Sequence, residues 1–307
     1  MTKQPNAALF TFLMLLAMTA WGASWTSGKL IAAMAPPEVL IFWRFLFTFV
    51  SYIPVMIFFR KSFRLNANSL RQALLGAVLI VTYNKFFFWG LQNGLAGAGG
   101  VLVTTLNPIL TFLFMIILFR RPAKLKDVFG LILGFIGGSV LLEIWAINVQ
   151  GLFTSGNAFF LFASCAWAFL TLTSEKSKAN MSPIVFSFYV FGLSALLDFF
   201  IALPQGVFDV FKEGWIFWLN VLYLSVFATT FATTIYFVAS VRLGSHKASS
   251  YIFLVPASAV LISWAVLHEN PRPSTIIGGI IAVAAVYLIN VKPKATPQAE
   301  ITAPENG

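Results

Sequence analysis

Three ionisable side chains stand inside long apolar stretches of the sequence, and they carry its clearest chemical signal. Arg44, Lys85 and Asp198 each lie a turn or two from the same predicted end of their segments, so we expect all three at one depth. A charge within a bilayer is costly, which makes such groups candidates for function. Two cations and one anion suit a small molecule that carries a carboxylate, with or without an amine. Alternatively, Arg44 ties helices together through backbone carbonyl groups, and Asp198 only partners Lys85.

Aromatic side chains accompany these charges in the sequence. Trp21 and Trp25 share one helix face at a spacing of i, i+4, and Tyr83 and Asn84 directly precede Lys85. Aromatic walls with a few placed polar groups are the usual design of a small-molecule site, although helix packing and interfacial belts use the same residues. The predicted substrate-binding residues are Trp21, Trp25, Arg44, Tyr83, Asn84, Lys85, Trp167, Asp198, Thr233 and Tyr236.

Two polar stripes run at helical spacing through the second half of the chain. Steps of three and four residues place each stripe on one helix face. Their hydroxyl groups either bind neighbouring helices or line water. The stripes are Ser187, Phe191, Ser194 and Asp198, and Ser225, Thr229, Thr233, Tyr236 and Ser240.

The segments that must position these residues are apolar and long. The chain has 307 residues, of which 59% are hydrophobic and only 10% charged. A membrane-spanning helix needs about 20 mostly apolar residues. The sequence therefore predicts an all-α polytopic membrane protein with ten transmembrane helices. They are expected at 8–30, 38–59, 72–91, 98–119, 127–146, 156–174, 183–203, 215–239, 247–268 and 274–291.

The charge distribution predicts the orientation of these helices. The net charge is +10, and 15 of the 20 lysines and arginines fall in the segments on one predicted side, against three on the other. This bias is typical of cytoplasmic loops, so it indicates topology and not nucleic-acid binding. We expect a bacterial inner-membrane protein with both termini in the cytoplasm and a disordered tail at 292–307. A single cysteine, Cys165, predicts neither a disulfide nor a cysteine metal cluster, and no metal or cofactor is expected.

The two halves of the chain carry matching landmarks. Each predicted half, 1–148 and 149–291, holds five spans, and an odd number of spans inverts the second half relative to the first. The sequence thus predicts two inverted five-helix repeats with a site between them. The matching landmarks are Trp21 with Trp167, Pro37 with Pro183, Pro108 with Pro256, and Gly130 with Gly278.

Proline and glycine positions predict hinges and close packing. Pro108 and Pro256 are expected near the middle of spans four and nine, where each would release a backbone carbonyl and form either a hinge or a static bend. Small residues at every fourth position favour packing of spans five and ten. These residues are Gly130, Gly134, Gly138, Gly278 and Ala282. The glycine run Gly94, Gly97, Gly99 and Gly100 lacks the lysine and hydroxyl of a phosphate loop and is expected to be a flexible connection.

These motifs together resemble the drug/metabolite transporter superfamily, in its ten-helix EamA-type branch. The resemblance covers 8–291 and departs where Trp167-Ala168 stands in place of Trp21-Gly22, so close backbone approach is expected only at Gly22. The matching motifs are Ala20-Trp21-Gly22, Phe42-Trp43-Arg44-Phe45, Asn107-Pro108-Ile109, Gly130-Leu131-Ile132-Leu133-Gly134, and the run from Leu243 through Pro256 to His268-Glu269 and Gly278-Gly279.

The resemblance implies a secondary transporter that works by alternating access. We expect its substrate to be an amino acid or a related zwitterion, with a larger adenosyl or nucleotide-type metabolite as the alternative. A membrane enzyme would need a catalytic cluster, and His246 and His268 are predicted at opposite membrane faces, so no enzyme is expected. The expected partners are the small-molecule substrate and the lipid bilayer, with the protein a monomer or weak homo-oligomer. A nearby Lys85 would keep Asp198 ionised, so exchange or facilitated diffusion is as plausible as proton antiport.

Overall fold

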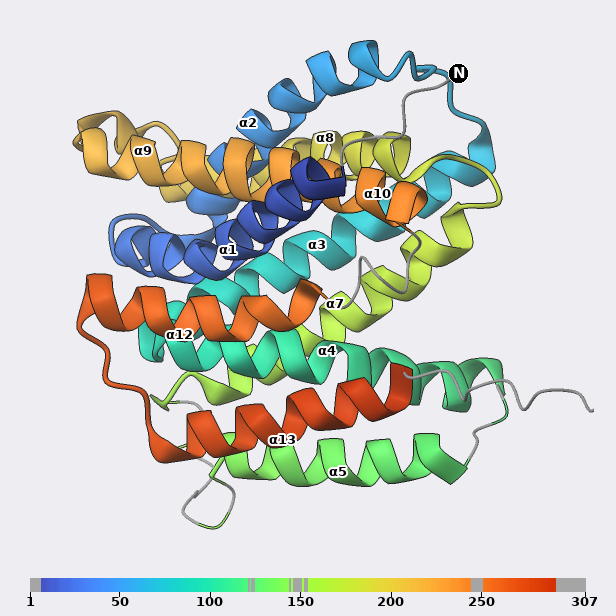
Figure 1. The fold of residues 1–307 in the computed structure, drawn as a ribbon. Coiled ribbons are helices and arrows are strands. Elements are labelled where there is room, and N and C mark those ends of the chain that lie inside the picture. The colour runs from blue at the N-terminus through green and yellow to red at the C-terminus, as the bar shows by residue number, and fades with distance from the viewer. Residues whose placement is uncertain are drawn as a thin grey trace, which may run out of the picture.

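Helices that run back and forth form the computed structural model of this chain, which describes residues 7–120, 122, 125–143, 145, 151, 154–243 and 251–290. No strand occurs among them (Figure 1). The first half contains α1 (Ala7–Ala32), α2 (Pro37–Phe58), α3 (Ala67–Asn93), α4 (Ala96–Phe119) and α5 (Leu125–Leu141). The second half contains α7 (Asn157–Ser177), α8 (Pro183–Ala202), α9 (Trp215–Leu222), α10 (Ala232–Leu243), α12 (Leu254–Leu267) and α13 (Pro273–Asn290).

Short irregular helices complete these elements. A π-helix at Tyr223–Phe231 joins α9 to α10 without interruption. Single 3-10 turns occupy Leu203–Gln205, Asp209–Lys212 and Tyr251–Phe253. The predicted tail at 292–307 lies outside the described residues, as does His246.

Seven helices are long and apolar enough to cross a membrane: α1, α2, α3, α4, α7, α8 and the continuous helix from Trp215 to Tyr236. Three shorter apolar helices, Val128–Leu141, Leu254–Leu267 and Pro273–Leu288, lie where the other three spans were predicted. Many large apolar side chains point outward, as suits contact with lipid. The prediction of an all-helical, multi-pass membrane protein is confirmed at this level.

Local sequence explains where several helices begin. Pro37 and Pro183 each occupy the first position of a helix, where the missing N–H costs no hydrogen bond. Ser182 caps α8 by accepting a hydrogen bond from the Val185 N–H at 3.4 Å. Asn66 caps α3 in the same way, accepting from the Ser69 N–H at 2.7 Å.

Helix contacts pair the two halves of the chain. α2 packs on α8, α4 on α12, and α5 on α13. By chain order, α1 corresponds to α7, α4 to α12, and α3 to the π-helix with α10. The contact of α1 with α12 has its counterpart in the contact of α7 with α4. The contact of α1 with the π-helix and α10 likewise has its counterpart in that of α7 with α3. The start of α1 and the end of α13 lie at the same end of the bundle (right in Figure 1). A two-fold relation between the halves would produce this pattern.

Glycines let several of these helices approach closely. A Cβ atom on Gly22 would lie 2.0 Å from the Ser258 Oγ and 2.9 Å from the backbone nitrogen of Ala259, so α1 and α12 touch almost backbone to backbone. Of Gly134, Gly137 and Gly138 on α5, only Gly137 faces the α13 backbone, at Ala282. Gly134 and Gly138 instead face α4, against Ile109 and Leu106. α5 thus lies at the edge of the bundle, in contact with both α13 and α4 (Figure 1).

Three of the four glycines in the predicted flexible connection belong to a helix instead. Gly97, Gly99 and Gly100 lie in the first turns of α4. The missing side chains at Gly99 and Gly100 leave room for Phe160 and Ala259 to pack on this helix. The expectation of a flexible connection there is wrong.

The two prolines also occupy different settings. Pro108 lies inside α4, as predicted. Pro256 instead lies in the first turn of α12, directly after the 3-10 turn at Tyr251–Phe253, where a proline is well tolerated. The prolines are therefore not equivalent mid-helix positions, and a hinge at either remains a prediction.

Candidate functional site

Arg44 is the residue on which three elements of the bundle converge. From α2, its Nη1 donates to the Asn84 Oδ1 on α3 at 2.8 Å, and its Nη2 donates to the Thr229 Oγ1 on the π-helix at 3.4 Å. The guanidinium carbon lies 5.6 Å from the ring centre of Phe87, within cation–π range. Its Nε has no hydrogen-bond partner in the described part of the chain. Arg44 therefore keeps one N–H donor, at Nε, that no described residue uses.

Asn84 and Thr229 are oriented by their own helices. The Asn84 Nδ2 donates to the Ile80 carbonyl at 2.8 Å, which turns its Oδ1 toward Arg44. The Thr229 hydroxyl donates to the Leu224 carbonyl five residues earlier at 2.7 Å, a reach that the wider π-helical turn provides. Hydrogen bonds within α3 and the π-helix thus orient the acceptors around Arg44.

A row of aromatic rings starts beside Arg44. Trp25 lies 4.8 Å from Phe87, Phe87 lies 6.0 Å from Tyr83, and Tyr83 lies 4.7 Å from Trp167, measured between ring centroids. The row links α1, α3 and α7 and forms part of the main buried core. Four predicted site residues, Trp25, Arg44, Tyr83 and Asn84, are therefore brought together, and Trp167 lies at the far end of the row.

Trp21 and Tyr236 belong to a different cluster. Their rings lie 5.5 Å apart, and the Trp21 Nε1 donates to the Ala228 carbonyl of the π-helix at 2.8 Å. This cluster, which includes Met14 and Met18, is separate from the core that holds Trp25. Thr233 is half-buried, one turn beyond Thr229. The α1 helix thus presents its two tryptophans to different neighbours, although they share a sequence spacing.

Lys85 forms an ion pair with Glu38, which is not among the predicted site residues. Its Nζ lies 2.9 Å from the Glu38 Oε1, and 4.9 Å from the ring centre of Trp89. Glu38 belongs to the first turn of α2, a position that favours acidic side chains because of the helix dipole. In the sequence, this preference explains an acidic residue at position 38, but it does not predict that Glu38 pairs with Lys85.

Asp198 has no such partner. Its side chain is 1% exposed, and neither carboxyl oxygen has a hydrogen-bond partner among the described residues. One turn earlier, the Ser194 hydroxyl donates to the Val190 carbonyl at 2.7 Å and approaches the Ala77 carbonyl of α3 at 3.4 Å. The same face of α8 therefore packs against α3, and Asp198 is enclosed without a donor.

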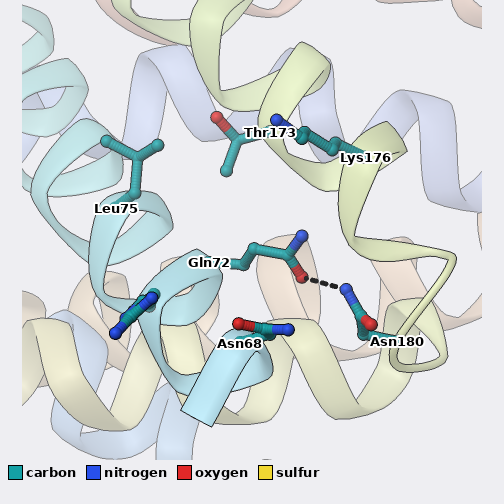
Figure 2. Close-up of a pocket in the computed structure, with 7 residues that line it drawn as sticks. Asn68, Gln72, Leu75, Thr173, Lys176 and Asn180 are labelled. Carbon is teal, nitrogen blue, oxygen red and sulfur yellow. Dashed lines mark hydrogen bonds between the residues drawn. The ribbon is translucent and has the colours of Figure 1, made fainter.

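A polar cleft opens at the opposite end of α3, far along the helix from Lys85. Figure 2 shows Gln72 and Asn180 reaching across it, with the Asn180 Nδ2 donating to the Gln72 Oε1 at 3.1 Å. The volume is about 440 Å³. Sequence patterns do not predict this cleft, because its residues come from the start of α3 and from the end of α7 and the turn after it, which are distant in sequence. It is lined by Asn68, Arg71, Gln72, Leu75, Thr173, Lys176 and Asn180.

Comparison with known proteins identifies relatives of this chain. Curated relatives include an uncharacterized transporter of Archaeoglobus fulgidus, 24% identical over 283 residues, which covers 91% of this chain and 96% of the relative. Another is the probable amino-acid metabolite efflux pump of Salmonella typhimurium, 25% identical over 291 residues, covering 90% and 93%. A solved crystal structure is similar in fold, with a TM-score of 0.63 at 19% identity over 92% of this chain and 96% of the other.

The family model for EamA-like transporters matches the chain twice, at residues 9–142 and 154–291. These two matches cover nearly all of the helices in Figure 1. The chain belongs to the EamA-like transporter family.

Proposed function

We propose that this protein carries a small zwitterion, an amino acid or a close relative, across the bacterial inner membrane by alternating access. The observation that carries the proposal is Arg44, which is held in place by Asn84 and Thr229 and keeps an unpaired Nε. A guanidinium with free donors binds a carboxylate well. The name of the Salmonella relative supports the substrate class.

The aromatic row provides the apolar part of the proposed site. A ligand whose carboxylate meets Arg44 would place its remaining atoms near Phe87, Tyr83 and Trp25. Aromatic faces also attract an ammonium group, which suits a zwitterion. The same faces would stack on a purine ring, so an adenosyl or nucleotide-type metabolite is the competing substrate.

The paired helix contacts support the transport mechanism. In our proposal the two halves are inverted five-helix repeats, and one half rocks against the other about the contacts of α4 with α12 and of α2 with α8. Both termini would lie in the cytoplasm. Cys165 is the single cysteine, so a Cys165→Ser background allows accessibility labelling of cysteines introduced at either end of the bundle. Labelling of the two ends of the described chain from opposite sides would contradict this topology.

The substrate is tested by counterflow in proteoliposomes. Vesicles loaded with an unlabelled L-amino acid should accumulate the same labelled amino acid, with each common L-amino acid tried in turn and adenosine nucleotides as competitors. Arg44→Ala should abolish accumulation and Arg44→Lys should weaken it, because lysine lacks the fork of donors. Arg64→Ala, at an exposed arginine between α2 and α3, is the matched control and should behave as the parent. Competition only by nucleotides would replace the amino-acid assignment.

A further inference from the structure

Asp198 is a carboxyl group enclosed by helices and left without a donor. It is 1% exposed, lies near the end of the apolar helix α8, and neither oxygen accepts a hydrogen bond from any described residue. Burial of a lone charge costs several kcal/mol, whereas a carboxylic acid that keeps its proton avoids most of that cost. Such a group needs a counter-charge or a proton.

The neighbouring charges do not supply the counter-charge. Glu38 on α2 and Lys85 on α3 both act on Asp198 electrostatically, and they are paired with each other at 2.9 Å. Arg44 on α2 points its Nη atoms at Asn84 and Thr229. Of the other elements packed on α8, α7 carries Glu175 and Lys176 at its far end and the turn at Leu203–Gln205 has no charged residue; the Arg242 side chain on α10 is outside the described part.

Charge counting then favours one proton in this group of three. Two carboxyl groups and one ammonium group sum to one negative charge, and a single proton makes the trio neutral. Glu38 and Lys85 remain partly accessible, with side chains 15% and 37% exposed, whereas Asp198 is closed off. The proton therefore belongs on the buried member, Asp198.

We infer that Asp198 is the proton-coupling site of the carrier, and that Lys85 exchanges its partner between Glu38 and Asp198 during the transport cycle. This inference rests on the proposed transport function. In the state described here, Lys85 binds Glu38 and Asp198 holds a proton. When the halves move and Lys85 turns to Asp198, the proton leaves the carboxyl oxygen for water, and the ammonium group replaces it as the counter-charge. No bond other than O–H is broken.

The proton itself is detected without any substrate. Exposed carboxyl groups titrate at about pH 4, so infrared difference spectra of the purified protein are taken between two pH values well above that range. They should contain the C=O band of a protonated carboxylic acid, and Asp198→Asn should remove it. Asp209→Asn, at an exposed acid paired with Lys212, is the matched control and should keep the band. A band that survives in Asp198→Asn would overturn the assignment.

Coupling is tested in proteoliposomes that contain a pH-sensitive dye, with an equimolar mixture of the common L-amino acids as the probe. Parent protein should move protons with the amino acids and should accumulate them in response to a pH gradient. Asp198→Asn should lose both while retaining measurable amino-acid counterflow. Glu38→Gln, which frees Lys85 for Asp198, should also lose the proton movement and serves as the second variant. Accumulation driven by a sodium gradient, or unaffected by pH in the parent, would overturn the inference.

The two hypotheses fail in distinguishable ways. Absence of counterflow for every amino acid in the parent would remove the proposed function, and the infrared result would still decide whether Asp198 holds a proton. Robust counterflow in the parent without proton movement would leave the carrier intact and remove only the coupling role.

Discussion

The Nζ of Lys85 lies 2.9 Å from the Oε1 of Glu38, across the contact between α3 and the first turn of α2. Lys85 also lies over the ring of Trp89, one turn along its own helix. The amine thus has two partners, and neither is Asp198. This single pairing separates the three charges that the sequence predicts within the membrane: Lys85 is ion-paired, Arg44 is hydrogen-bonded, and Asp198 is an isolated acid.

Reversal of the pair should be tolerated better than loss of either charge. Lys85→Glu and Glu38→Lys should each lower the melting temperature of the detergent-solubilised protein, and the double reversal should recover part of the loss. The coupling should amount to about 1 kcal/mol, because both groups are partly exposed. A Lys85→Glu/Asp198→Lys reversal is the comparison, and it should recover less, because Lys85 pairs with Glu38 and not with Asp198 in the state described here. Equal recovery in both reversals would contradict the pairing.

Asn84 should affect the apparent substrate affinity because its side chain orients Arg44 through a hydrogen bond. Asn84→Ala removes the acceptor of the Arg44 Nη1, and a hydrogen bond to a charged group contributes about 1.5–3 kcal/mol. We expect at least a tenfold rise in the concentration needed for half-maximal counterflow, since about 1.4 kcal/mol corresponds to a factor of ten. Asn93→Ala is the matched control, because Asn93 makes the same bond to its own helix and is exposed. Unchanged half-saturation in Asn84→Ala would remove Asn84 from the site.

Gly22 should tolerate no side chain. Its Cβ position lies 2.0 Å from the Ser258 Oγ and 2.9 Å from a backbone nitrogen, so Gly22→Ala must push α1 away from α12. Overpacking of this kind costs about 1–3 kcal/mol and should appear as a lower melting temperature. Gly214→Ala, where the added Cβ meets nothing within 4 Å, is the control and should leave the melting temperature unchanged. Equal stability of the two variants would show that α1 and α12 are not in close contact.

Pro108 should affect the rate of transport more than substrate affinity if α4 bends during the cycle. Pro108→Ala restores a helical N–H and should slow counterflow by about tenfold, equivalent to about 1.4 kcal/mol of barrier, with half-saturation unchanged. Pro54→Ala is the matched control, because Pro54 also lies inside a helix but is exposed. Parental rates in Pro108→Ala would make the proline a static bend.

The sequence alone determined most of the local structure. Backbone groups in hydrocarbon must bond within their own helix, so apolar runs of sufficient length predict helices directly. Pro37 and Pro183 mark helix starts in both halves because proline fits only the first turn without loss. Because a charge within a membrane is costly, the sequence also predicted Arg44 and Lys85 as site residues. Tyr83 and Asn84 were predicted because they directly precede Lys85.

Only the tertiary structure decided which side chains meet. Helical spacing places Gly134 and Gly138 on one face of α5, but it contains no information that the face meets α4 while Gly137 meets α13. It places Trp21 and Trp25 on one stripe, although they enter different clusters. Glu38 reaches Lys85 because the start of α2 and the last turns of α3 lie at the same end of the bundle. A one-dimensional pattern specifies the direction in which a residue faces along its own helix, whereas the neighbour it faces depends on how all the helices pack.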